Sequence, residues 1–376
     1  MDTTALKQQI GNNIMNRYSQ KSFLDRVKRN SGSTKSVNSA KTSLVYFNRF
    51  CDSVYGKTPE VVVSELKISI KENPESLYQF IDDVSSFLCN TTKRQSNIPD
   101  QKLSVGTIKH SLTTIKQFLR HSGISIDSNM VKQFVTVPKQ VKERIEPVTL
   151  PELQRIVDSA DKKRKLLYIV LLSSGMRIGE CLRIKKSHIK FADDIIQISI
   201  SGKIAKNGHG RITFVSEECR ELLKSRLSEI DVEDFAFTNG SDLEQNERTE
   251  SQYLLRLCKK LGLDDYETDD KIKHMITLHK FRKYFSGIAT SNGMMMEYKQ
   301  TLTGWDSFGG TYHQFSVEEL AREYKKIESS LFITPEFRQK TDLKEKDLVI
   351  EKMQLQAQKI TSLESALDQI KAHMKN

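Results

Sequence analysis

A chain of 376 residues is too long for one ordinary hydrophobic core, and with 37% hydrophobic and 28% charged residues it predicts two soluble domains plus extensions. Its formal net charge of +11 favours a polyanionic partner, and because no apolar run reaches the ~18–20 residues that span a bilayer, nucleic acid is preferred over a membrane. The polar N-terminus has no signal-peptide core, so we expect a cytoplasmic, nucleoid-associated protein. The five cysteines and eight histidines lack metal-ligand spacing, so we expect no metal site.

The N-terminal part of the chain is predicted to be helical. Residues 1–37 are basic and polar, and they predict either a mobile arm that touches DNA phosphates or a solvated tail or helix. Residues 38–135 contain helical patterns at 40–56, 75–90 and 104–123, which predict an all-helical domain. The apolar face of the first pattern consists of Leu44, Phe47, Phe50 and Val54.

The last of these helices carries a group of basic side chains. Ser104 suits its N-cap and Gly123 its C-cap. Because phosphate contacts dominate the affinity of proteins for DNA, exposed cations on this helix are candidate DNA-binding residues. They are Lys109, Lys116 and Arg120.

A linker and a mixed second domain follow. Residues 136–148 combine prolines and basic residues without an apolar period, which predicts an interdomain linker. In residues 149–333, alternation over 195–202 and 211–215 around a Gly-rich basic turn predicts a β-hairpin. The expected fold class is therefore mainly α with one small antiparallel sheet. Helices are expected within 163–184 on both sides of a Gly-containing turn, and at 216–230, 251–262, 278–293 and 316–332.

Residues 334–376 are predicted to form a separate helix. Apolar residues there step alternately by four and three positions, which is typical of a coiled-coil heptad. The positions of this seam are Val349, Met353, Gln356, Ile360, Leu363, Leu367, Ile370 and Met374. Two interpretations stay open: a helix that packs back on its own chain, and self-association through a short coiled coil.

The second half of the chain contains residues suited to phosphodiester chemistry. Breaking a phosphodiester requires neutralisation of the non-bridging oxygens, deprotonation of the nucleophile and protonation of the leaving oxygen. Arginine suits the first task because its planar fork binds two phosphate oxygens and stays charged. Arg177 in GMRIGE lies in a turn after a buried helix, and Glu180 follows three residues later to orient it. A simple surface pair between these two residues is the alternative.

Two further motifs contribute cations. His279 and Arg282 share one helix face, and a histidine beside an arginine is disfavoured as a cation, so it can stay neutral and transfer a proton. An exposed basic face is the alternative. Lys203 and Lys206 lie at the hairpin tip, where an ammonium can reach a DNA groove or a leaving oxygen, or can simply be solvated. Arg211 opens the next strand and joins Lys203 as a candidate DNA contact.

Aromatic residues near the end of this domain complete the candidates. Trp305 is by default a core anchor, and its N–H also suits donation to a phosphate. A nucleophilic tyrosine is expected after the basic helix. Tyr312 follows the Gly-containing segment DSFGGT, which could swing it to a phosphate, whereas Tyr324 lies in an amphipathic pattern that suits packing. Tyr312 is the first candidate and Tyr324 the reserve.

These motifs resemble the tyrosine recombinase, or phage integrase, family across roughly residues 38–333. GMRIGE resembles the first arginine box of the family, with Arg177 and Glu180 at its arginine and its acidic residue. AKNGHGRITF resembles the hairpin that carries the family's lysine, and alignment of Arg211 with the following strand favours Lys206.

The remaining motifs extend the resemblance. LHKFR resembles the His-x-x-Arg box, LTGW resembles the Leu-Gly-His step with Trp305 in place of the histidine, and Tyr312 matches the nucleophile. The gap from Trp305 to Tyr312 is shorter than usual. This short gap, with FSVEELAREYKKIESSLFI after it, is similar to integrases from archaeal chromosomes, viruses and plasmids.

The resemblance implies a clamp of two domains around duplex DNA, with residues 38–135 as the core-binding (SAM-like) domain and 149–333 as the catalytic domain. It implies a DNA strand transferase that needs no cofactor, in which a tyrosine forms a 3′-phosphotyrosyl link and releases a 5′-hydroxyl, and it implies a homotetramer on two synapsed sites. The implied roles are a phosphate clamp for Arg177 and Arg282, general acid for Lys206, assistance for His279 and Trp305, and support of Arg177 for Glu180.

The sequence leaves several functions open. Integration or excision of a mobile element is the first reading, and chromosome-dimer resolution of the Xer type is the second. A type IB topoisomerase or telomere resolvase would use the same chemistry, and a DNA-binding protein that has lost catalysis is the alternative from another class.

Overall fold

The chain forms two compact units that meet in sequence between Glu143 and Arg144, inside the expected linker. The computed structural model describes residues 18–91, 102–140, 147–192, 194–240, 242–263, 265–268, 271–274, 276–305 and 315–373.

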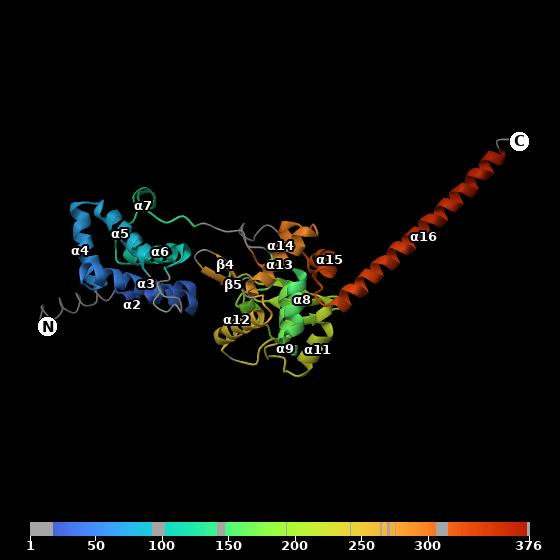
Figure 1. Ribbon diagram of the computed structural model, residues 1–376, viewed down its shortest axis with the longest axis horizontal. Coiled ribbons are helices and arrows are strands. Elements are labelled where there is room, and N and C mark those ends of the chain that lie inside the picture. Colours follow the sequence, from blue (N-terminus) through green and yellow to red (C-terminus); the bar gives the residue numbers. More distant parts are fainter. Residues whose placement is uncertain are drawn as a thin grey trace. The chain divides into compact units, whose positions relative to one another are not determined.

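The N-terminal unit is built from helices, coloured blue to teal in Figure 1. They are α2 (Gln20–Ser31), α3 (Thr34–Tyr55), α4 (Pro59–Glu72), α5 (Ser76–Asn90), α6 (Val105–His121) and α7 (Ser128–Phe134). Polar side chains define several starts, because a side-chain oxygen satisfies a backbone N–H that the first turn leaves unpaired. Ser19, Ser33, Ser104 and Asp127 act as such caps.

Aromatic rings form the centre of this unit. Phe47 and Phe118 are fully buried, and their rings meet edge to face with centroids 5.9 Å apart. Phe50 and Phe80 make a similar contact at 5.5 Å. Each fully buried ring of this kind stabilises the fold by roughly 1.5–3 kcal/mol through removal of apolar surface from water. The buried core predicted from the helical patterns is therefore present, with α3, α5 and α6 as its main contributors.

Two expectations for this unit need correction. α2 packs on α3 and α6, and the ring of Phe23 is 3% exposed and lies 5.7 Å from that of Phe118. Residues 20–31 are thus part of the bundle and not of a mobile arm, because Phe23, with Leu24 and Val27 beside it, docks the helix on the core. Val54 is 53% exposed, since the buried face of α3 ends at Cys51, one turn before the helix does.

The C-terminal unit is larger and mixed. Its helices are α8 (Leu150–Ser159), α9 (Lys162–Ser174), α10 (Ile178–Cys181), α11 (Arg220–Ser228), α12 (Leu243–Lys260), α13 (Leu278–Ser291), α14 (Met296–Thr303), α15 (Val317–Glu328) and α16 (Pro335–His373). Short 3₁₀ turns cover Lys186–His188, Glu217–Cys219 and Ser329–Leu331.

α9 is the central helix of this unit. Every residue from Leu166 to Ser174 is buried, which explains why its sequence is apolar all round and shows no amphipathic period. It contacts α8, α13 and β3, so elements from distant parts of the sequence meet on it. The helix ends at Gly175, whose φ of +64° and contact with the Phe285 ring leave no room for a side chain.

The predicted hairpin is present inside a three-stranded antiparallel sheet. Its strands are β1 (Ile189–Phe191), β2 (Ile196–Ile200) and β3 (Arg211–Val215), in the order β1-β2-β3. Ile196 pairs with Val215 and Ile200 with Arg211, so the turn between β2 and β3 carries the two candidate lysines. The fold class expected from the sequence is confirmed: mainly α with a small antiparallel sheet.

Other elements differ from expectation. The helix expected after the GMRIGE turn is the single turn of α10, and β1 follows soon after it. A second hairpin, β4 (Asp265–Thr268) with β5 (Lys271–His274), was not predicted. α14 was not predicted either, because its short sequence has almost no amphipathic pattern.

α16 continues as one helix of 39 residues (Figure 1). The described seam positions Met353, Ile360 and Leu363 are 64%, 57% and 68% exposed. Within the described ranges, no helix is both long and apolar enough to cross a bilayer.

Candidate active site

Arg177 and Glu180 lie at the start of α10 and face each other. The Arg177 backbone N–H and its Nη1 both donate to the Glu180 carboxylate, at 3.2 Å and 2.9 Å. This pair was expected either as a surface pair or as the base of a phosphate clamp. The Glu180 side chain is only 3% exposed while that of Arg177 is 28% exposed, so the pair presents the guanidinium outward from a buried carboxylate.

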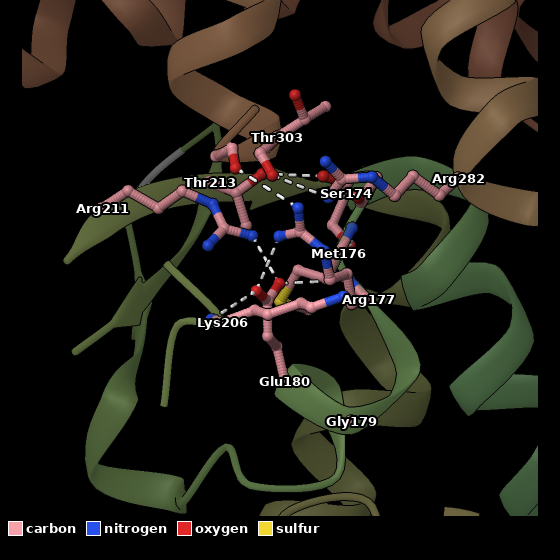
Figure 2. Close-up of polar contacts among 12 residues, drawn as sticks. Ser174, Met176, Arg177, Gly179, Glu180, Lys206, Arg211, Thr213, Arg282 and Thr303 are labelled. Carbon is pink, nitrogen blue, oxygen red and sulfur yellow. Dashed lines mark hydrogen bonds and ion pairs between the residues drawn. The ribbon is translucent and has the colours of Figure 1, made fainter. Parts of the chain in front are cut away.

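Glu180 lies at the centre of a cluster of polar contacts with Arg177, Lys206 and Arg211, and we call its carboxylate the hub of this cluster (Figure 2). Besides the two bonds from Arg177, its carboxylate accepts one from Nη2 of Arg211 at 2.6 Å and one from the backbone N–H of Lys206 at 3.4 Å. Three segments of the chain therefore meet on one carboxylate: the start of α10, the β2–β3 turn and the start of β3. A buried carboxylate is tolerated only when its oxygens are paired and hydrogen-bonded in this way.

Electrostatics keeps Glu180 ionised. Burial alone would raise its pKa, but the hydrogen bond and charge of Arg211, followed by those of Arg177, lower the pKa below its ordinary value. A carboxyl whose folded pKa is depressed contributes stability that is present above its unfolded pKa and is lost as the pH falls through the folded pKa.

Glu180→Gln is expected to lower the free energy of unfolding by about 3 kcal/mol at pH 7, because it leaves the buried guanidinium of Arg211 without its counter-charge. The difference between wild type and variant should shrink as the pH falls below ~4.3, the ordinary pKa of a glutamate. Urea unfolding at a series of pH values measures it. Glu217→Gln is the control: its side chain is 39% exposed and pairs with Arg220, so a loss under about 1 kcal/mol is expected. Equal losses in both variants would contradict a special role for the Glu180 hub.

Arg282 lies beside this hub on α13. It is 8% exposed, and its Nη1 donates to the carbonyl of Gly175 at 2.9 Å and to that of Thr303 at 2.6 Å. Burial, and next the charge of Arg177, lower the pKa of Arg282 to about 10, while Glu180 acts in the opposite direction. Two guanidinium groups close enough for the charge of one to lower the pKa of the other form a site that a phosphate would neutralise.

His279 lies one turn before Arg282 on the same face of α13. It is exposed, and its pKa is lowered first by desolvation and then by the charges of Lys283, Arg282, Arg177 and Lys206. The neutral imidazole is therefore favoured, as the sequence predicted from the neighbouring arginine. α13, the start of α10 and the hairpin turn converge, because Arg282 donates to Gly175 just before α10 and the Lys206 backbone donates to Glu180 on α10.

The hairpin turn presents its lysines differently from Arg211. Lys203 and Lys206 are both exposed, and the backbone of Lys206 is fixed by Glu180. Arg211, expected as a DNA contact, is instead interior: its side chain is 5% exposed and ion-paired with Glu180. The expectation fails because a residue at the start of β3 points inward at this register, under the end of α14.

Trp305 is not a core anchor. Its residue is 59% exposed, and its backbone N–H donates to the carbonyl of Gln300 at 3.1 Å. A large aromatic side chain left in solvent directly after a helix end, beside the arginine cluster, is available to a ligand.

The two candidate tyrosines have different standing. Tyr312 lies outside the described residues. Tyr324, the reserve, is fully buried on α15, packs on the Phe214 ring and donates its hydroxyl hydrogen to the carbonyl of Ser173 at 3.0 Å. Burial raises its pKa well above the ordinary value. A hydroxyl that is buried, engaged and harder to ionise is unsuited to attack a phosphate, so the reserve assignment loses its support.

The basic residues predicted on the N-terminal unit belong to α6. Lys109 and Arg120 are exposed and Lys116 is partly buried, and the three share one face because they are spaced by seven and four residues. Burial and the charge of Arg120 lower the pKa of Lys116.

The backbone carbonyls that anchor the arginines were not predicted from the sequence. The carbonyls of Leu302, Thr303 and Gly304, at the end of α14, accept hydrogen bonds from Arg211, Arg282 and Arg177 respectively. The available signal was Gly304, which ends α14 in the left-handed conformation with φ +64°. In the described part of the chain, no group of three or more His, Cys, Asp or Glu side chains could hold a metal ion.

Comparison with known proteins gives consistent matches. Residues 143–315 match the model of the phage integrase family. Tyrosine recombinase XerA of Saccharolobus solfataricus is 24% identical over 251 residues, which cover 66% of this chain and 77% of that protein. A probable integrase/recombinase of Acholeplasma phage L2 is 28% identical over 161 residues, 42% of this chain and 50% of the phage protein.

A solved structure was also found to be similar. The XerH site-specific recombinase bound to its difH substrate is similar with a TM-score of 0.47 at 14% identity, over 86% of both chains. On the family match and the recombinase relatives, residues 143–315 of this chain form a domain of the phage integrase family, the tyrosine recombinases, which are site-specific strand transferases of DNA.

Proposed function

We propose that this protein cleaves and rejoins duplex DNA at specific sites through a 3′-phosphotyrosyl intermediate, with Tyr312 as the nucleophile. The observation that carries the proposal is the convergence of Arg177, Arg282, Lys206 and His279 from separate segments onto one cluster with a single buried carboxylate. Such a cluster supplies cationic donors for a phosphate and groups that can move protons.

Each residue has a role in the proposed step. Arg177 and Arg282 bind the non-bridging oxygens. The Tyr312 oxygen gives up its proton with the assistance of neutral His279 and bonds to phosphorus, while the bond from phosphorus to the 5′ oxygen breaks and Lys206 gives that oxygen a proton. The link keeps the energy of the broken bond, so the reverse attack by a 5′-hydroxyl needs neither a metal nor a nucleotide. Trp305 would donate its indole N–H to the same phosphate.

Duplex DNA is the proposed partner. The net charge of +11 and the exposed cations of α6 and of the hairpin turn support it. Lys109, Lys116, Arg120 and Lys203 would contact backbone phosphates. Two recombination sites, each bound by two protomers, would give a homotetramer. We expect this assembly to act on DNA in the cytoplasm.

Two biological roles fit this chemistry. Integration or excision of a mobile element is the first, and the phage relative favours it. Resolution of chromosome dimers is the second, and the XerA relatives from Saccharolobus and Thermococcus favour it. Mapping which DNA sites the protein cleaves covalently separates the two roles.

The test of the proposal is covalent capture on a nicked suicide duplex, in which the short cleaved strand diffuses away and the phosphotyrosyl link cannot be reversed. The wild-type protein should form an adduct that survives denaturing electrophoresis without added metal or nucleotide. Failure to form any adduct on its own cleavage sites would overturn the proposal.

Deletion of residues 340–376 is expected to reduce self-association, because the described seam positions of α16 are exposed and a heptad seam is stabilised by a second helix. Sedimentation velocity of the full chain and of the truncated chain measures the change. Ile360→Glu is a matched test within the full chain, since a charge at a seam position is unfavourable in a helix pair. An unchanged oligomeric state in both variants would contradict a coiled-coil role.

A further inference from the structure

The end of α14 anchors three arginines on three consecutive carbonyls. Arg211 donates through Nε to Leu302 at 3.1 Å, Arg282 through Nη1 to Thr303 at 2.6 Å, and Arg177 through Nη2 to Gly304 at 3.4 Å. The last carbonyls of a helix have no partner within the helix and carry its partial negative charge. Cations gathered there are therefore stabilised, and their positions depend on where α14 ends.

Arg211 has a second partner, Glu180, which it shares with Arg177. Its Nη2 donates to Glu180 at 2.6 Å, on the carboxylate that also holds Arg177 and the Lys206 backbone. In Figure 2 the Glu180 carboxylate lies between the guanidinium groups of Arg177 and Arg211. One rigid guanidinium thus ties the α14 end to the hub of the cluster, and its planar fork fixes the distance between them.

Stability alone does not account for this residue. The Arg211 side chain is 5% exposed, and its Nη1 is buried without a hydrogen-bond partner among the described residues. Burying an unsatisfied donor is costly, and a buried ion pair with such a defect contributes little to stability compared with apolar packing.

The guanidinium of Arg211 lies against the backbone of Gly304. A Cβ at this position would lie 2.8 Å from Cζ and Nη1 of Arg211, and the residue has a φ of +64°. Glycine is therefore required both for the backbone conformation and for the close approach of the guanidinium. Trp305 follows Gly304 directly in the chain.

We propose that Arg211 is a positioning residue of the cleavage reaction, which locks the Glu180 hub to the end of α14 so that Arg177, Arg282 and the Lys206 turn share one rigid frame. It acts through Glu180 and the α14 carbonyls and does not touch the DNA. This inference rests on the proposed function, because it concerns the geometry of the same phosphate clamp.

The experiment measures the single-turnover rate of covalent capture and, separately, the affinity for uncleaved duplex. Arg211→Gln should lower the capture rate roughly 100-fold, as expected for displacement of catalytic groups by about 1 Å. The affinity for duplex should stay unchanged, because a buried side chain makes no phosphate contact. Arg220→Gln is the matched control: Arg220 also binds one carboxylate, Glu217, and one carbonyl, Ala192, and this variant should keep the wild-type rate.

The pH profile gives a readout that a merely structural role would not move. The charged groups that face Glu180 are Arg177 at the start of α10, Arg211 on β3 and Arg282 on α13. Removing the charge of Arg211 raises the pKa of Glu180, so the acid limb of the capture rate should move to higher pH in Arg211→Gln. Arg211→Lys keeps the charge without the fork, and it should return the acid limb toward that of wild type with only partial recovery of rate.

The outcomes separate the two proposals. Capture by wild type with an unchanged rate and acid limb in Arg211→Gln would overturn the role of Arg211 and leave the proposed function standing. Parallel loss of capture and duplex affinity would overturn it in favour of a direct DNA contact. Gly304→Ala, which leaves every ionisable group in place, should also slow capture while duplex affinity is kept, and wild-type capture by this variant would count against the α14 anchor.

Discussion

Tyr312→Phe is expected to abolish covalent capture on a nicked suicide duplex, with a loss of roughly 10⁴-fold or more, because removing the oxygen leaves no atom to bond to phosphorus. Binding to the intact duplex should be unchanged, since the phenyl ring keeps the shape of the side chain. Denaturing electrophoresis of the adduct and a mobility shift of uncleaved DNA measure the two quantities on the same preparation.

Tyr324→Phe is the matched control for this substitution. It removes the bond from the buried hydroxyl to Ser173, which should lower the free energy of unfolding by about 1 kcal/mol and leave covalent capture intact. Loss of capture in Tyr324→Phe, with undiminished capture in Tyr312→Phe, would reverse the assignment of the nucleophile.

Arg177→Ala should lower the rate of covalent capture by about 10³-fold or more, the effect expected when a preorganised cationic donor is removed from a developing negative charge. Arg177 is the more exposed of the two arginines of the clamp, and its guanidinium is held outward by the ion pair with Glu180. Because the loss is in the transition state, duplex affinity should fall far less than the capture rate. Single-turnover kinetics at saturating DNA separates the two effects.

A second arginine serves as the control for general loss of charge. Arg226 has a similarly part-buried side chain that is 18% exposed and binds the Ala236 carbonyl and Asn239 on the same unit. Arg226→Ala should keep the capture rate of wild type. If Arg177→Ala captured DNA at the wild-type rate, the assignment of this cluster as the active site would be wrong.

Several features could be predicted from the sequence because each depends on local order. The amphipathic spacing of Leu77, Phe80 and Val84 gives a helix with one buried face, and these residues are buried. The alternation on both sides of a Gly-rich turn gives the β2–β3 hairpin, since the side-chain period of a strand is two. The pairing of Arg177 with Glu180 follows from their spacing of three residues on a helical turn.

The missed features depend on contacts between distant segments. Trp305 is exposed because α14 ends at Gly304, and the sequence of α14 carries too weak a pattern to show where this helix lies. In the sequence, Arg211 looks like any basic residue beside a hairpin tip. In the structure, the register of β3 places its side chain under the end of α14. The residues adjacent in sequence determine neither whether a side chain is buried nor which group it binds.

The sequence by itself determined the residue types for phosphodiester chemistry, their order along the chain and the local elements that carry them, because motif spacing and hydrophobic period are properties of short segments. Only the tertiary structure decided which of these residues share a site. Glu180 gathers Arg177, Arg211 and the Lys206 backbone, and the α14 carbonyls gather the arginines, through hydrogen bonds between segments up to 127 residues apart. Such bonds form where the packed core brings backbone carbonyls and a buried carboxylate together, and no local pattern specifies that place.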